Sequence, residues 1–244
     1  MKILALDSSG LVASAAVMEN DCLLAEYTVN YKKTHSQTLL PMLEEIKNMI
    51  ELDLNTVDAI AIASGPGSFT GLRIGSATAK GLGLALGRPL VEVPTLEGLA
   101  YNLCGTHRLV CPLMDARRNQ VYTGIYEFIP AGHSWEMRTV EEQRAVDISV
   151  ILANLEKLGR EVIFLGDGVP VFAERIKAEL SVPYAFAPAH MNRQRAASVA
   201  ALGAVYFAQG RIVTAADHQP EYLRKSQAER EREERYGNID SQAQ

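Results

Sequence analysis

A glycine-rich loop is the segment whose residue types point most directly to chemistry. Residues 65–70 read Gly-Pro-Gly-Ser-Phe-Thr and lead into a predicted helix. Backbone N–H groups at a helix N-terminus, helped by the helix dipole, bind anions such as phosphate. The loop lacks the Gly-Lys-Ser/Thr ending of a Walker A motif, so a plain turn with a helix cap is the alternative.

A second polar turn, Asp7-Ser8-Ser9-Gly10, follows the first predicted strand. Its carboxylate and two hydroxyls could face a phosphate or its magnesium ion, but the same residue types are standard in a β-hairpin turn. No cofactor is required by the sequence. The two turns together predict a vestigial nucleotide site, with ATP or ADP bound weakly or shared with a partner, at Asp7, Ser8, Ser9, Gly65, Gly67 and Ser68.

The helix after the glycine-rich loop has a stripe of small residues, spaced four apart, at Gly71, Gly75, Ala79 and Gly83. Glycine in a helix interior costs about 1 kcal/mol relative to alanine, so something must lie very close to this face. The chain's own sheet or a helix of another subunit could fill that place. We predict the subunit contact, formed by Leu39, Leu43, Ile46, Gly71, Gly75 and Ala79.

Catalytic and metal-binding patterns are missing from the sequence. The five histidines are not spaced as HxxxH or HExxH, and there is no Gly-x-Ser-x-Gly elbow. The three cysteines have no CxxC spacing, which indicates reduced thiols in a cytosolic protein. We therefore predict no catalytic residues and no metal ligands.

The overall composition limits the kinds of partner that the chain can bind alone. Its net charge of −5 argues against a stand-alone nucleic-acid binder, although a subunit of an RNA-handling assembly fits. No run of residues is long and apolar enough to cross a membrane, and no signal peptide precedes the first strand. A cytoplasmic location without membrane contact is expected.

The predicted elements that would position these turns alternate between strands and helices. Three strands at hairpin spacing are followed by a helix that begins between Ser36 and Thr38, and then by a strand–helix–strand unit around the glycine-rich loop. A second set of strands and helices follows. The predicted division is a first lobe over 1–104 plus about 192–224, a smaller second lobe over 105–191, and a charged tail over 225–244 that is solvated or disordered.

Five short motifs along the chain form a pattern typical of one protein family. They are Ile3–Ser9, His35-Ser36 with Leu39–Pro41, Gly65–Gly75, Asp115–Arg118 and Pro220–Arg224. On these motifs the chain resembles the TsaB (YeaZ) family of the actin–Hsp70–sugar kinase superfamily. The resemblance implies an α/β fold with two ribonuclease-H-like (actin-like ATPase) lobes, in which mixed sheets are flanked by helices and the second lobe is reduced.

The same resemblance implies a function in tRNA modification. Family members support the synthesis of threonylcarbamoyladenosine, a modified adenosine beside the anticodon. The chain would be a non-catalytic scaffold and activating subunit. It would bind the catalytic paralogue TsaD through its first-lobe helices and act with the ATPase TsaE. It would contact tRNA only through the complex, and it would form a homodimer when alone.

One short segment separates a catalytic subunit from a partner subunit. TsaD has an Asn-His-Leu-Glu-Gly-His run whose two histidines hold a metal, and the matching run here is Pro94–Leu99. Thr95 and Leu99 occupy the histidine positions, and neither side chain can replace an imidazole ligand. The resemblance therefore implies a chain that is not an enzyme by itself.

Two other functions stay open as alternatives. An independent weak ATPase or small-molecule kinase would use Asp7, the loop over 65–70 and a second phosphate turn at Gly166-Asp167-Gly168. That last turn is equally an ordinary loop. A metalloprotease is the third alternative, and the missing histidine ligands weigh against it.

Overall fold

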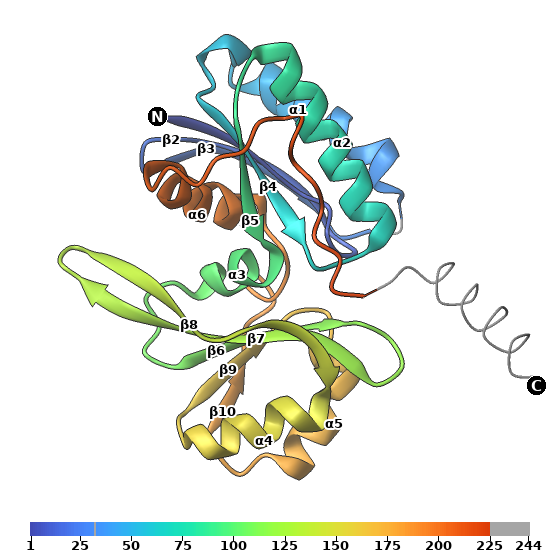
Figure 1. The fold of residues 1–244 in the computed structure, drawn as a ribbon, viewed down its shortest axis with the longest axis vertical. Coiled ribbons are helices and arrows are strands. Elements are labelled where there is room, and N and C mark those ends of the chain that lie inside the picture. Colours follow the sequence, from blue (N-terminus) through green and yellow to red (C-terminus); the bar gives the residue numbers. More distant parts are fainter. Residues whose placement is uncertain (32, 225–244) are drawn as a thin grey trace, which may run out of the picture.

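The computed structural model describes residues 1–31 and 33–224, which form two five-stranded mixed sheets with helices packed on them (Figure 1). The predicted charged tail over 225–244 lies outside the described residues. None of the helices in the described ranges is long and apolar enough to span a membrane.

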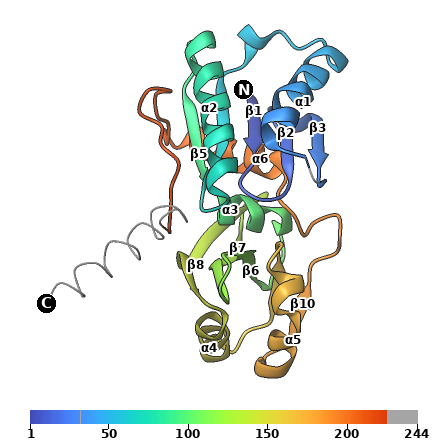
Figure 2. The same cartoon turned by 90° about the vertical axis from the view of Figure 1, so that its right-hand side faces the viewer.

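The first sheet has the strand order β3-β2-β1-β4-β5, with β2 antiparallel to β1 and β4 parallel to it. The interiors of its central strands β1 and β4 are continuously apolar and buried, because helices cover both faces of the sheet. Helices α1 and α2 pack on one face and α6 on the other (Figure 2). The bounds are β1 Lys2–Asp7, β2 Ala13–Glu19, β3 Cys22–Val29, β4 Ala59–Gly65, β5 Leu90–Pro94, α1 His35–Met49, α2 Phe69–Leu86 and α6 Ala196–Ala208.

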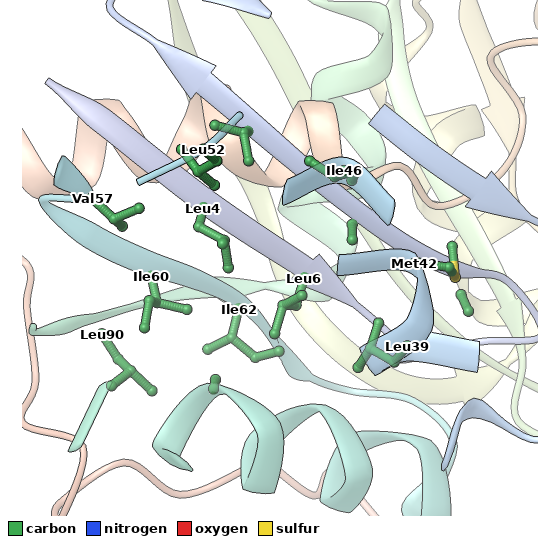
Figure 3. Close-up of a cluster of buried hydrophobic side chains, with 14 of the residues drawn as sticks. Leu4, Leu6, Leu39, Met42, Ile46, Leu52, Val57, Ile60, Ile62 and Leu90 are labelled. Atoms are coloured by element: carbon green, nitrogen blue, oxygen red, sulfur yellow. The ribbon is translucent and has the colours of Figure 1, made fainter. Parts of the chain in front are cut away.

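The core between this sheet and helices α1 and α2 is built from residues with period-2 spacing on the strands. Leu4 and Leu6 of β1 and Ile60 and Ile62 of β4 point to the same side, where Leu39 of α1 meets them (Figure 3). These side chains are almost completely buried. The burial explains why the helices are held against the sheet.

The second sheet repeats the strand order of the first when it is read from β8, as β8-β7-β6-β9-β10. Strand β7 is antiparallel to its neighbours β6 and β8, and β9 and β10 run parallel to β6. Helices α4 and α5 cover one face. The bounds are β6 Leu109–Asp115, β7 Gln120–Ala131, β8 Ser134–Asp147, β9 Val162–Leu165, β10 Tyr184–Phe186, α4 Ile148–Leu158 and α5 Val169–Glu179.

Three short helical segments complete the fold. Helix α3, Thr95–Ala100, continues into the 3-10 helix η2, Tyr101–Leu103, and packs against strands β6 and β7 of the second sheet. The 3-10 helix η1, Leu54–Thr56, precedes β4. The short helix α3 is therefore the apolar link between the two sheets.

The last described residues, Arg211–Arg224, form an extended segment that we name the strap. It returns from α6 along β5, where Val213 and Leu90 exchange two backbone hydrogen bonds of 2.9 Å. It then descends beside α2 towards the second sheet (Figures 1 and 2). The strap has no regular secondary structure beyond the single bridge to β5.

Candidate functional site

The two polar turns meet at the carboxyl ends of β1 and β4. The Ser68 N–H donates to the Ser9 carbonyl over 2.7 Å, and the Ser68 hydroxyl caps α2 by accepting from the Gly71 N–H over 3.3 Å. A Cβ atom on Gly67 would lie only 2.2 Å from the Ser9 oxygen. Glycine at that position is therefore explained by the close approach of the two turns.

Both hydroxyls of the first turn are already bonded to protein atoms. The Ser8 hydroxyl donates to the Gly71 carbonyl over 2.9 Å, and the Ser9 hydroxyl donates to Asp7 Oδ1 over 2.6 Å. Both serines are buried. In this arrangement both hydroxyl donors are committed to protein acceptors. Nucleotide binding at the six candidate residues stays a prediction.

Asp7 is the buried charged group of this site. Burial raises its pKa from 3.8 to about 6, although hydrogen bonds from the Ser9 hydroxyl and N–H oppose the rise. A carboxyl group with this pKa changes its protonation state close to neutral pH. It is the most strongly perturbed acidic group at the two turns.

Two neighbouring side chains keep polar atoms without a protein partner. His35 contacts the Gly10 carbonyl through Nε2 over 2.9 Å, while its Nδ1 is buried and unpaired. Both side-chain polar atoms of the buried Gln194 are also unpaired, and this side chain lies against Gly10. Buried polar atoms of this kind are usually satisfied by water or ligand. Sequence reasoning missed Gln194, which belongs to none of the motifs.

The third candidate turn, Gly166-Asp167-Gly168, packs against strand β6. A Cβ atom on Gly166 would lie 2.1 Å from the Leu113 carbonyl oxygen. Asp167 accepts weakly from the Asp115 N–H over 3.4 Å, and burial raises the pKa of the Asp167 carboxyl. The glycines therefore serve a close backbone approach within the second sheet.

The stripe of small residues on α2 faces the chain's own first sheet. A Cβ atom on Gly71 would lie 2.1 Å from the Ser8 carbonyl oxygen, and one on Gly75 would lie 2.3 Å from the Ser8 hydroxyl. Ala79 is completely buried. The subunit contact predicted for these three residues is therefore wrong, because Ser8 and the sheet already fill the space in front of them.

The predicted contact residues of α1 need the same correction. Leu39 and Ile46 are almost completely buried in the core shown in Figure 3, so a partner could not reach them. Leu43 is half-buried at the edge of this core. Of the six predicted contact residues, it alone has appreciable exposed surface.

Comparison with known proteins identifies the family. A family model described as "TsaD: tRNA N6-adenosine threonylcarbamoyltransferase" matches residues 22–232. The TsaB protein of Bacillus subtilis is 34% identical over 94% of this chain and 96% of its own length. The chain belongs to the TsaB (YeaZ) family. Its relatives are proteins of tRNA threonylcarbamoyladenosine biosynthesis, including TsaB of Escherichia coli at 27% identity over 93% of this chain and 96% of that protein.

A solved family structure confirms the predicted fold class. YeaZ from Pseudomonas aeruginosa superposes with a TM-score of 0.75 at 28% identity, covering 91% of this chain and all of that one. The mixed α/β fold, with two mixed sheets flanked by helices, is thus shown. The division into lobes at residues 104 and 192 stays a prediction.

The segment Pro94–Leu99 is largely built into the interior of this family member. The Thr95 hydroxyl accepts a hydrogen bond from the Gly65 N–H over 3.1 Å. Leu99 lies in the apolar cluster between α3 and the second sheet. Within residues 1–31 and 33–224, no three His, Cys, Asp or Glu side chains are grouped to hold a metal ion.

Proposed function

We propose that the chain is a non-catalytic, activating subunit of a cytoplasmic complex that makes tRNA threonylcarbamoyladenosine. It binds a catalytic TsaD-type paralogue through helices α1 and α2, and it acts with a TsaE-type ATPase. It contacts tRNA only through the complex and self-associates through the same helices when alone. Membership of the TsaB family supports this proposal.

The observation that supports the non-catalytic role most directly is that Thr95 and Leu99 make structural contacts inside the chain. Both positions match metal-binding histidines of TsaD, and here both side chains serve the internal structure of the chain. A threonine hydroxyl bonded to a backbone N–H and a buried leucine supply no imidazole for a metal ion. The catalytic centre of the complex therefore belongs to the paralogue.

The exposed side of α1 and α2 offers a surface for that partner. Ala77, Gly81 and Ala85 form a second stripe of small residues, spaced four apart, on the exposed side of α2. A Cβ atom on Gly81 would meet nothing within 4 Å. Exposed apolar side chains also lie at Leu84 on α2 and at Leu40 and Met49 on α1. A partner helix could approach α2 closely at this stripe.

The test uses two arginine substitutions at exposed helix positions. Gly81→Arg is expected to fold, because its side chain enters open space, and to weaken binding of the paralogue by roughly tenfold or more. Ala153→Arg on α4 is the matched control and should bind normally. Pull-down with the purified paralogue and a tRNA modification assay supply the readouts. Wild-type binding and modification by Gly81→Arg would refute the surface.

A separate measurement tests the non-catalytic role. The chain with the TsaE-type ATPase, threonylcarbamoyl adenylate and tRNA is expected to give no modified tRNA until the paralogue is added. Modification without the paralogue would show that this chain carries the catalytic groups itself. The result does not depend on which surface forms the contact.

A further inference from the structure

The first half of the strap is anchored to the first sheet and to the helices that pack on it, with Arg211 stacked on Tyr206 of α6. Lys80 of α2 donates to the carbonyls of Ala216 and His218 over 3.1 and 2.9 Å. The His218 ring lies 2.6 Å from a carboxylate oxygen of Glu92 on β5. Ala215 packs into the core between the sheet and α2. This half of the strap moves with the first sheet.

The end of the strap is seated on the start of α2. The Glu221 N–H donates to the Ser64 carbonyl over 2.7 Å. The Tyr222 ring lies on Phe69, with 4.3 Å between the ring centroids. Gly65 has a φ of +127°, and a Cβ atom there would lie 2.2 Å from the Glu221 carbonyl oxygen. The glycine-rich loop is thus shaped to receive the strap.

Two residues at this end of the strap, Glu221 and Arg224, also form hydrogen bonds with the second sheet and its β6–β7 turn. Gln143 of β8 donates to the Glu221 carboxylate over 2.6 Å. Arg224 donates to the Ala116 carbonyl in the turn between β6 and β7. In that turn Arg117, Arg118 and Asn119 all have positive φ, between 57° and 65°. Three consecutive non-glycine residues in the left-handed region persist only where surrounding contacts hold them.

A cavity of about 440 Å³ is lined on one side by strap residues that precede or include Glu221, which contacts both sheets. Its walls come from the strap and from the carboxyl ends of β4 and β5, and they include Ser64, Glu92, Gln219 and Glu221. A segment over a cavity makes fewer packing contacts than one that lies on a close-packed surface. The end of the strap therefore depends on its own hydrogen bonds and on the Tyr222 ring contact.

We propose that Glu221–Arg224 is a clasp that sets the angle between the two sheets. The apolar cluster around α3 joins the sheets, but apolar contacts are non-directional and fix an angle poorly. Hydrogen bonds are directional, and those from Gln143 and Arg224 add a constraint on this angle. When the clasp opens, the β6–β7 turn separates from the start of α2 and the two sheets rock about α3.

The test measures the distance between spin labels on the two sheets' helices. Labels are placed at exposed positions Glu45 of α1 and Lys157 of α4, with the exposed Cys22 and Cys104 replaced by serine. The labelled chain is diluted with unlabelled chain so that only distances within one molecule count. Arg224→Met removes the bond to Ala116 and should shift and broaden the distance distribution.

Amide exchange gives a second readout of the same variant. The Glu221 N–H should exchange roughly tenfold faster in Arg224→Met, the change expected for loss of one charge-assisted hydrogen bond. Arg108→Met is the matched control, because Arg108 pairs with Glu161 within the second sheet, away from the clasp. It should change neither readout.

A second variant, at the Gln143–Glu221 hydrogen bond, tests the clasp independently if Arg224→Met fails to fold. Gln143→Leu removes the 2.6 Å bond to the Glu221 carboxylate, together with a longer 3.4 Å bond to the Gly65 carbonyl, and should give the same shift in the label distance and faster exchange. Wild-type distances and wild-type exchange in a folded variant at either attachment would overturn the clasp.

Discussion

The Asp7 carboxyl group is buried at the end of β1, and its pKa of about 6 has a consequence for stability. The folded chain holds this proton to a higher pH than the unfolded chain does. The free energy of unfolding therefore falls as the pH rises from about 4 to about 6. Asp7→Asn cannot ionise, so its stability relative to wild type should increase by roughly 3 kcal/mol across this range.

Urea unfolding of both chains at several pH values measures this difference. Asp147→Asn is the control with the opposite sign, because hydrogen bonds from Ser149 at the start of α4 lower the pKa of Asp147. Its stability relative to wild type should fall as the pH rises through the acid range. A pH-independent difference for Asp7→Asn would contradict the buried, proton-holding carboxyl group.

At the scale of one helix, two of the glycines of α2, Gly75 and Gly81, should respond in opposite ways to substitution by alanine. Gly75→Ala places a methyl group 2.3 Å from the Ser8 hydroxyl oxygen. Overpacking of this kind costs about 1–3 kcal/mol, which outweighs the roughly 1 kcal/mol gained in helix propensity. Gly81→Ala meets open space and should stabilise the chain by about 1 kcal/mol.

Chemical denaturation compares these two variants with wild type. If Gly75→Ala matched Gly81→Ala in stability, the close contact between α2 and Ser8 would be absent. Both substitutions lie in the same helix and add the same methyl group. The comparison therefore isolates what each glycine faces.

The sequence was a good guide to α2 as an element and a poor one to its orientation. Small residues at i and i+4 indicate a close approach, but Gly71 and Gly75 follow that rule as well as Ala77 and Gly81 do. Only the structure distinguishes the stripe on Ser8 from the stripe on the surface. The spacing of small residues predicts that a helix face allows close packing, but it does not predict which element packs there.

Besides the two 3-10 helices, three elements escaped prediction for different physical reasons. Strand β8, Ser134–Asp147, lies at the edge of its sheet, and its many charged residues weaken the apolar signal. Helix α3 has only six residues, too few for a helical period to show. Strand β10, Tyr184–Phe186, is three residues long, too short for an alternating pattern to show, and lies between Pro183 and Pro188. The apolar strands β1, β4 and β9 were predicted because burial on both faces makes them continuous.

At the scale of the whole molecule, α3 should decide whether the two sheets unfold together. Leu99 is buried where α3 meets the second sheet, in the cluster that Trp135 also touches. Leu99→Ala should cost about 2–5 kcal/mol and separate the two unfolding transitions. Trp135 is the only tryptophan, so its fluorescence reports the second sheet, while far-UV circular dichroism reports both.

In wild type the two signals are expected to change at one urea concentration. In Leu99→Ala the fluorescence change should occur at a different concentration from the circular dichroism change. Leu158→Ala is the control, because this side chain lies exposed at the end of α4. Coincident transitions in Leu99→Ala would mean that α3 does not couple the two sheets.

The Ser8 and Ser9 hydroxyls donate their hydrogen bonds to acceptors within the chain, and this bears on whether the loop needs a ligand to keep its shape. A loop that satisfies its own donors holds its shape without a small molecule. The conformation of the first turn of α2 would then not depend on the concentration of ATP or ADP. The surface of α1 and α2 proposed above as the docking face would then be the same at high and at low ATP concentration.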